Sequence, residues 1–156
     1  MASHESSIDV NVPLSTAFEE WTDYPSFPRF MEDVHAVHAL DDGRIRWRAT
    51  LGSRPREWDA EVDTDRDGGR ISWRSVSGAQ HDGEVVLSHK DDTTTTVRLR
   101  MAYDSGGVIE GAGGAAKAVR SWVEHGLRNF KRYAEELEAG RREAEEAASG
   151  RSRGGE

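Results

Sequence analysis

Four carboxylates occupy alternate positions in one short stretch of the chain, at Glu57, Asp59, Glu61 and Asp63. Paired carboxylates can act as general acid and base when both face a substrate in a shielded pocket. Side chains at alternate positions of a strand share one face, and these four alternate with apolar residues such as Trp58. The spacing therefore predicts a solvated strand face and no acid/base pair.

The histidines are the next candidates for chemistry. His35 and His38 form an H-x-x-H pair, but an odd spacing on a strand points two rings to opposite faces, so they cannot share a metal. The other histidines show no ligand spacing, and the chain contains no cysteine for disulfide or thiolate chemistry. We expect no metal and no cofactor.

A glycine-rich segment, GAGGAA at residues 111–116, matches the G-x-G-x-x-A form of the dinucleotide fingerprint. A dinucleotide-binding unit needs a further parallel strand after the helix that follows, and only a polar tail remains here. Two interpretations are left open. The small residues let the helix pass close to a sheet, or they leave room for a ligand.

Arg56 is the one arginine that shares strand parity with Trp58 and is expected to point inward. It could also be an end-of-strand arginine that extends its head group to solvent.

The first quarter of the chain predicts a strand and two short helices. Residues 6–13 alternate until Pro13 removes a ladder donor, and residues 14–23 have helical spacing. Pro25 and Pro28 then allow only one more short turn.

Six strands and one long helix are predicted to follow. Between residues 31 and 103 the apolar period is two and is broken by turn signals, so hairpins join the strands; the turn signals are LDDGR, LGSRP, DRDGGR, VSGAQHDG and HKDDTT. The period then returns to 3.6, and the helix is expected to end near Gly140. Its apolar stripe is expected to consist of Ala112, Ala115, Val119, Trp122, Val123, Leu127, Phe130, Ala134 and Leu137. Residues 3–139 would form the folded domain, and the polar residues 140–156 a disordered tail.

Parity divides the predicted strands into an apolar and a charged face. On the charged face the sign alternates from strand to strand, so neighbours in an antiparallel meander would pair favourably, by roughly 0.2–1 kcal/mol each. A bulge is expected in the stretch SRPRE. The apolar face collects Ile45, Trp47, Ala49, Leu51, Trp58, Ala60, Val62, Ile71, Trp73, Ser75, Val85, Leu87, His89, Val97, Leu99, Met101 and Tyr103.

A family resemblance rests on four segments, VNVPLSTAFEEWTDYPSFPRFM, EWDAEV, ISWRSVSG and GEVVL, followed by one terminal helix. The chain resembles the polyketide cyclase/dehydrase and lipid-transport family of the START-like (SRPBCC) superfamily, related to coenzyme Q-binding proteins. The resemblance implies an α+β helix-grip fold, with a seven-stranded antiparallel sheet wrapped around a long C-terminal helix and two short helices between strands 1 and 2.

The resemblance also implies a cavity for a hydrophobic ligand between sheet and helix. Phe27, Phe30 and Met31 would either cap this cavity or close the core. The other candidate ligand contacts are Trp47, Trp58, Trp73, Leu99, Met101, Tyr103 and Trp122.

Three functions remain open at this point. The first is binding or carrying a small hydrophobic molecule such as a quinone, a lipid or an aromatic polyketide. The second is a polyketide aromatase/cyclase that uses Arg56, and the third is a scaffold whose core is filled by its own tryptophans. Few inward positions are polar, and catalysis needs positioned proton donors and acceptors, so binding is favoured over catalysis.

Composition excludes other partners. The net charge of −8 argues against nucleic acid and anionic membranes, both of which need a basic face. No apolar run approaches the length of about 18 residues needed for a membrane span, so we expect a cytoplasmic monomer without integral membrane association. The chain has 18 arginines against 3 lysines, as expected of a GC-rich bacterial genome.

Overall fold

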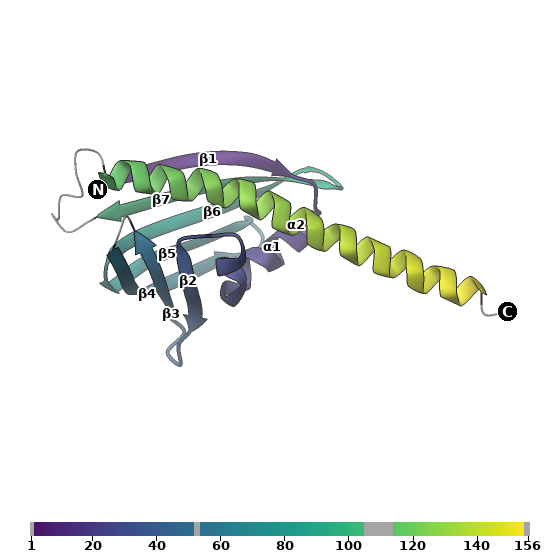
Figure 1. The fold of residues 1–156 in the computed structure, drawn as a ribbon, viewed down its shortest axis with the longest axis horizontal. Coiled ribbons are helices and arrows are strands. Elements are labelled where there is room, and N and C mark those ends of the chain that lie inside the picture. The colour runs from purple at the N-terminus through teal and green to yellow at the C-terminus, as the bar shows by residue number, and fades with distance from the viewer. Residues whose placement is uncertain (1, 52–53, 105–113, 155–156) are drawn as a thin grey trace.

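The computed structural model describes residues 2–51, 54–104 and 114–154. The elements in chain order are β1 Ala2–Val10, α1 Leu14–Thr22, η1 (a 3₁₀ helix) Tyr24–Arg29, β2 Val34–Ala39, β3 Ile45–Leu51, β4 Arg54–Asp65, β5 Arg70–Gly78, β6 Gln80–Asp91, β7 Thr94–Asp104 and α2 Gly114–Gly154 (Figure 1).

The strands form one antiparallel sheet in the order β1-β7-β6-β5-β4-β3-β2. Each strand from β2 to β6 pairs with the next in the chain, as hairpins require, and β1 lies at the edge of the sheet beside β7. The two edge strands, β1 and β2, are consecutive in the sequence, and α1 and η1 connect them. The predicted helix-grip fold is confirmed.

Helix α2 covers the inner face of the sheet and packs mainly against β1 and β7 (Figure 1). Its buried side chains recur with the period of a helix and form one stripe, as predicted. Leu137 was expected in this stripe but is 45% exposed and lies outside it. The buried members are Val119, Trp122, Val123, Leu127, Phe130 and Ala134.

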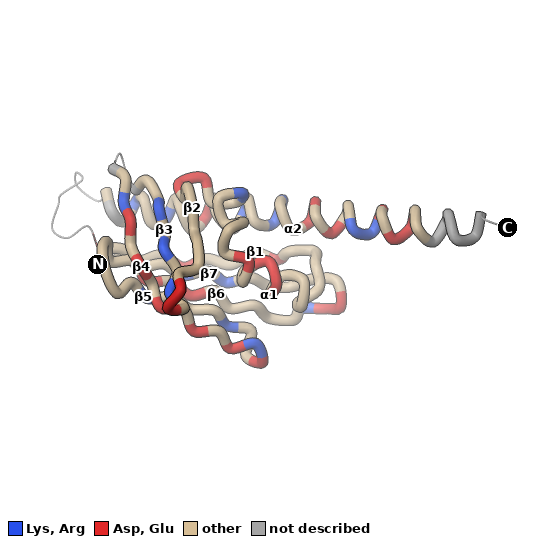
Figure 2. Tube along the Cα trace, turned by 90° about the horizontal axis from the view of Figure 1, so that it is seen from below, with Lys and Arg blue, Asp and Glu red and all other residues tan. Residues whose placement is uncertain are grey.

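The outer face carries the predicted ladder of alternating charge (Figure 2). Arg46 on β3 binds Asp59 on β4 through two hydrogen bonds of 2.8 and 3.2 Å, and Arg74 on β5 binds Glu61 at 3.2 Å. The hydrogen bonds from Arg46 hold the pKa of Asp59 below its ordinary value. Each exposed ion pair of this kind contributes little to the stability of the fold, so the main effect of the ladder is to favour one register between neighbouring strands.

The bulge lies elsewhere than predicted. Between β3 and β4 the register runs unbroken from Ile45 opposite Ala60 to Leu51 opposite Arg54, so the expected bulge in SRPRE was wrong for these pairs. Among the described strands the register shifts instead in three other pairs: between Val34 and Ala36 of β2, between His89 and Asp91 of β6, and between β4 and β5, where Val76 is the extra residue. The shift leaves Val76 partly exposed.

The end of α2 also differs from the prediction. The helix continues past Gly140 to Gly154 and protrudes beyond the sheet (Figures 1 and 2). Arg141 and Arg142 reach back to Glu138, with Nη2 and Nε at 2.7 and 3.2 Å from Oε1, and such pairs stabilise a helix. That residue 139 bounds the folded domain stays a prediction.

A second carboxylate lies near this point. The Glu138 side chain is only 3% exposed, and Glu20 of the half-buried face of α1 interacts with it electrostatically. Burial raises the pKa of Glu20 to about 7, and the negative charges of Glu138 and Glu19 add to this effect. Glu138 is stabilised as an anion by Arg141 and Arg142, so Glu20 takes up the proton.

Glu20→Gln tests this arrangement. The pKa of Glu20 is higher in the folded chain than its ordinary value of 4.5, so the folded state binds more protons between pH 4.5 and about 7. The contribution of Glu20 to stability is therefore present below that window and lost as pH rises through it. We expect the variant to melt higher than the parent at about pH 8 and alike at about pH 4.5, by circular dichroism. A Glu19→Gln control should show a smaller difference, and equal melting temperatures of parent and Glu20→Gln at both pH values would contradict the assignment.

Candidate functional site

The centre of the inner face is a set of four aromatic rings that all contact one another. His81 of β6 lies flat on Trp122 of α2, with ring centroids 4.7 Å apart and planes at 15°. Its centroid is 4.8 Å from that of Trp58 on β4 and 5.6 Å from that of Trp47 on β3. Trp47 and Trp58 stack at 5.7 Å, and Trp122 lies 6.4 and 6.2 Å from them. Trp47, Trp58, His81 and Trp122 are called the four-ring cluster below.

Small residues on β5 let these rings meet across the sheet. The β5 partner of Trp58 is Gly78, and the partner of Ala60 is Ser75. Neither carries a side chain large enough to separate the rings of Trp58 and His81. Ser75 also accepts a hydrogen bond of 3.0 Å from the backbone N–H of His81, which fixes the start of β6.

Trp73 of β5 borders the cluster. Its indole Nε1–H donates to His81 Nδ1 at 3.3 Å, and its ring lies 5.5 Å from that of Trp47. Trp73 pairs in register with Gly83 of β6, and a Cβ on Gly83 would lie 2.2 Å from Cζ2 of the indole. The ring therefore occupies the place that a side chain at position 83 would take.

His81 is the residue that the sequence analysis missed. It is fully buried, and burial lowers the pKa of its imidazole to about 3, so the ring is neutral at physiological pH. The stretch VSGAQHDG was assigned to a turn, whereas the turn is confined to the region of Gly78 and Ala79. Extending the parity of Val85 back by four residues would have placed His81 inward. His89, predicted inward, is exposed near the end of β6.

The cluster is rich in buried ring nitrogens. Nε1 of Trp47, Trp58 and Trp122 and Nε2 of His81 are shielded from solvent and have no hydrogen-bond partner among the described residues. Buried polar atoms in proteins are usually paired. Four such atoms on rings in mutual contact are therefore an unusual feature of this core.

A second aromatic cluster closes the end of the sheet near α1. Trp21 lies 5.6 Å from Phe27, 5.3 Å from Phe30 and 4.8 Å from Phe130 of α2. Phe27 also contacts Trp47 at 5.5 Å and thus joins the two clusters. Phe27, Phe30 and the neighbouring Met31 are each 1% exposed, so these predicted contacts belong to the core; whether they also touch a ligand stays a prediction.

The three candidates on β7 face the same interior. Leu99, Met101 and Tyr103 are at most 1% exposed. In register, Tyr103 lies opposite His81 and Met101 opposite Gly83. All ten predicted ligand contacts are therefore buried in one core, and their role in binding stays a prediction.

Arg56 occupies the position expected from parity, two residues before Trp58 on β4 and opposite Ala49 of β3. The residue is partly exposed, while its Nε and Nη2 atoms are shielded from solvent. The guanidinium thus lies at the margin of the inner face.

Gly126 marks an open space on the inner side of α2. It lies in the buried stripe, one turn after Trp122 and one turn before Phe130, and is itself buried. No described atom of another element lies within 4 Å of the position that its Cβ would occupy. The space is therefore flanked by one ring from each aromatic cluster.

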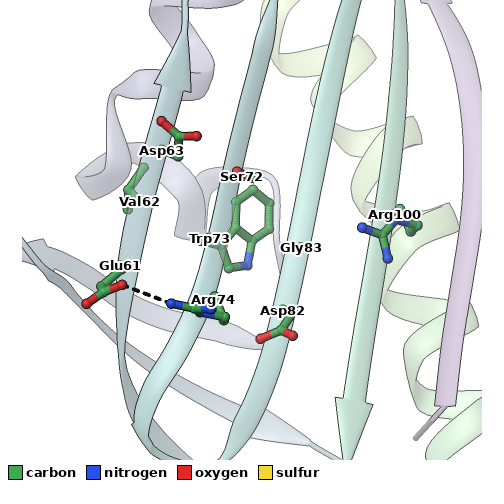
Figure 3. A pocket seen from close by; sticks show the side chains of 9 residues that line it. All are labelled: Glu61, Val62, Asp63, Ser72, Trp73, Arg74, Asp82, Gly83 and Arg100. Carbon is green, nitrogen blue, oxygen red and sulfur yellow. Dashed lines mark hydrogen bonds and ion pairs between the residues drawn. The ribbon is translucent and has the colours of Figure 1, made fainter.

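A different pocket, of about 390 Å³, lies on the charged face (Figure 3). Its polar lining comes from the charge ladder, and Arg74 is already paired with Glu61 across it. This pocket is open to solvent and its other lining residues are mostly charged, although Trp73 and Gly83 border the aromatic interior, and we assign it no function. It is lined by Glu61, Val62, Asp63, Ser72, Trp73, Arg74, Asp82, Gly83 and Arg100.

Comparison with known proteins identifies the family. The family model for polyketide cyclase/dehydrase and lipid transport matches residues 10–132. The chain belongs to this family. A relative from Streptomyces lincolnensis, the uncharacterized 17.2 kDa protein of the melC2-rnhH intergenic region, is 32% identical over 137 residues, covering 87% of this chain and 91% of the relative.

Solved structures of the START superfamily share the fold. A START superfamily protein from Mycobacterium smegmatis superposes with a TM-score of 0.74 at 11% identity, over 88% of this chain and 99% of that one. The di-domain aromatase/cyclase BexL of the BE-7585A biosynthetic pathway gives a TM-score of 0.68 at 25% identity, over 86% of this chain and 47% of BexL. A specific relation of this family member to coenzyme Q-binding proteins stays a prediction.

Two further observations concern membranes and metal ions. Among the described residues, no helix combines the length and the hydrophobicity that crossing a bilayer requires. Within the same residues, no three His, Asp or Glu side chains are grouped so that they could hold a metal ion.

Gly83→Ala should disturb the site through Trp73. The added methyl group would overlap the indole, so the ring or the strand must move, and overpacking of this kind costs about 1–3 kcal/mol. Urea unfolding followed by circular dichroism measures the loss. Gly140→Ala, at an exposed position where a Cβ meets no described atom, should instead stabilise by up to about 1 kcal/mol. Unchanged stability of Gly83→Ala would contradict the packing described for Trp73.

His81→Phe should alter the pH dependence of stability. The pKa of His81 is lower in the folded chain than its ordinary value of 6.5, so the unfolded state binds more protons between pH 6.5 and about 3. The contribution of His81 is present above that window and lost as pH falls through it. The variant keeps a flat ring without a titrating group, so its unfolding free energy should fall less steeply with acid. Replacement of the exposed His38 by Ala should leave the parent slope, and an equal slope for His81→Phe would show that His81 is not buried as described.

Proposed function

We propose that this protein binds a small, flat aromatic molecule between the inner face of its sheet and α2. The observation that carries the proposal is the open space beside Gly126, in a part of the core that is otherwise closely packed. Protein interiors seldom leave room that a side chain could fill. A glycine in the middle of a helix also destabilises it by up to about 1 kcal/mol, which the space for a ligand would explain.

The walls of this space favour a flat ligand. Trp122 and Phe130 flank Gly126 along α2, and each belongs to a cluster of rings. Aromatic rings contribute large apolar areas and prefer stacked or edge-to-face contacts with other rings. An aromatic ring system matches such walls better than a flexible acyl chain, whose ordering costs conformational entropy.

Family membership supports the same proposal. The solved structures similar to this chain include the aromatase/cyclase BexL. We favour binding or carrying over catalysis because His81, the central polar side chain, is a poor proton acceptor. A base whose pKa is about 3 accepts few protons near neutral pH.

A second candidate function is an aromatase/cyclase in which Arg56 polarises a substrate carbonyl. The observation that favours it is the shielding of Arg56 Nε and Nη2 at the margin of the inner face. Replacement of Arg56 by Ala would then reduce turnover on the order of a hundredfold, whereas a carrier of neutral ligands would lose about 1 kcal/mol of affinity or less.

Gly126→Leu tests the proposed function directly. The leucine side chain should enter the open space, so that the variant is as stable as the parent or more stable, while binding weakens by more than about tenfold. Saturable quenching of tryptophan fluorescence by 1,4-naphthoquinone measures the affinity, and thermal melting measures stability. Gly140→Leu, the same substitution on the exposed part of α2, should leave the affinity at the parent value.

Two results would contradict the proposal. If Gly126→Leu destabilises the fold strongly, the core has no room beside Gly126 and the protein is a scaffold whose core is filled by its own tryptophans. If the parent shows no saturable quenching with naphthoquinone or with other flat aromatic compounds, the binding function is wrong.

A further inference from the structure

The chemistry of the ligand can be narrowed from the ring nitrogens of the four-ring cluster. Trp47, Trp58, His81 and Trp122 all lie within 6.4 Å of one another, measured between ring centroids, and each is at most 3% exposed. An indole nitrogen carries a hydrogen and can only donate, so the three tryptophans contribute three N–H donors. The role of the imidazole depends on its tautomer.

The hydrogen bond from Trp73 determines the tautomer of His81. Its Nε1–H donates to His81 Nδ1 at 3.3 Å, so Nδ1 must carry a lone pair and no hydrogen. The His81 ring is neutral, since burial lowers its pKa to about 3. A neutral imidazole has one N–H, which must then be on Nε2. His81 Nε2 is therefore a donor as well.

The cluster thus presents four N–H donors and no free acceptor. None of the four has a hydrogen-bond partner within residues 2–51, 54–104 and 114–154. The one ring acceptor of the group, Nδ1 of His81, is already used by Trp73. A buried donor without an acceptor is unfavourable, and oxygen atoms of a bound molecule would relieve it.

We infer that the four-ring cluster selects flat ligands that carry carbonyl oxygens and no hydroxyl groups, such as quinones and aromatic ketones. This inference rests on the proposed function and specifies the ligand of the same site. A carbonyl oxygen accepts hydrogen bonds from ring N–H groups and brings no donor of its own. A hydroxyl group would bring an additional O–H for which the cluster has no acceptor, and a hydrocarbon would leave the N–H groups unpaired.

Three compounds of almost equal shape test the inference. They are 9-fluorenone, with a carbonyl group, 9-fluorenol, with a hydroxyl group in its place, and fluorene, with a methylene group. None requires a redox partner. Isothermal titration calorimetry should rank fluorenone first, by about two- to tenfold over each of the others, as expected for one or two neutral hydrogen bonds.

Indole N–H resonances give a second readout that is independent of affinity. In ¹H–¹⁵N correlation spectra, fluorenone should move the indole proton of at least one of Trp47, Trp58 and Trp122 downfield, because a hydrogen bond deshields it. The indole proton of Trp73 is already bonded to His81 and should move less. Fluorene should produce no downfield shift of the first three.

Variants that lack one indole N–H test whether these donors cause the preference for fluorenone. Trp58→Phe and Trp122→Phe retain an aromatic ring and remove one N–H, so at least one of them should reduce the preference for fluorenone over fluorene. Leu137→Met, a change of an exposed side chain on α2, should keep the parent preference and control for indirect effects.

The possible outcomes separate this inference from the proposed function. If the three compounds bind equally and the indole protons do not move downfield, the donors bind only water, and the inference is overturned while aromatic binding stands. If fluorenol binds best, the cluster supplies an acceptor and the tautomer assignment is wrong. If none of the three binds, both the inference and the proposed function fail.

Discussion

The burial of one apolar sheet face under a single helix is the constraint on which the rest of this structure depends. Seven strands curl toward α2, and their inward side chains leave water by packing against the buried stripe of that helix and against α1 and η1. The stacking of His81 on Trp122 is the contact at the centre of this arrangement. Burial of five tryptophans supplies a large part of the hydrophobic free energy of the domain, since aromatic side chains remove the most area from water.

An aromatic core has a consequence that an aliphatic one would not have. Every indole brings a polar N–H into the interior, and the folded chain provides an acceptor for Trp73 through His81 Nδ1. Trp21, Trp47, Trp58 and Trp122 are left without one among the described residues, and so is Nε2 of His81. The same packing that stabilises the fold thus leaves several N–H donors in the interior, which is the basis of our inference that the site favours oxygen-bearing rings over acyl chains.

The outer face of the sheet and the end of α2 depend on exposed ion pairs and not on apolar burial. Paired arginines and carboxylates on neighbouring strands are exposed and weak one by one, yet a shift of register by one residue would disrupt many of them together. The C-terminal part of α2 protrudes beyond the sheet (Figure 1), and local pairs such as Arg142 with Glu138 favour the helix there. Polar composition alone suggested disorder for this segment, because a helix sustained by local pairs has no apolar stripe to reveal it.

The sequence by itself determined the fold class, the order of the elements and the two faces of the sheet, because strand parity and helical period follow directly from backbone geometry. It also determined which tryptophans lie inside. Strand parity could have placed His81 inward, but only the tertiary structure decided that its ring meets those of Trp58 and Trp122, since this depends on a tight turn at Gly78 and on small residues of β5 that let rings from β4 and β6 meet. The tautomer of His81 and the space beside Gly126 were likewise decided only by the tertiary structure. Both are fixed by contacts between residues far apart in the chain, which no local pattern encodes.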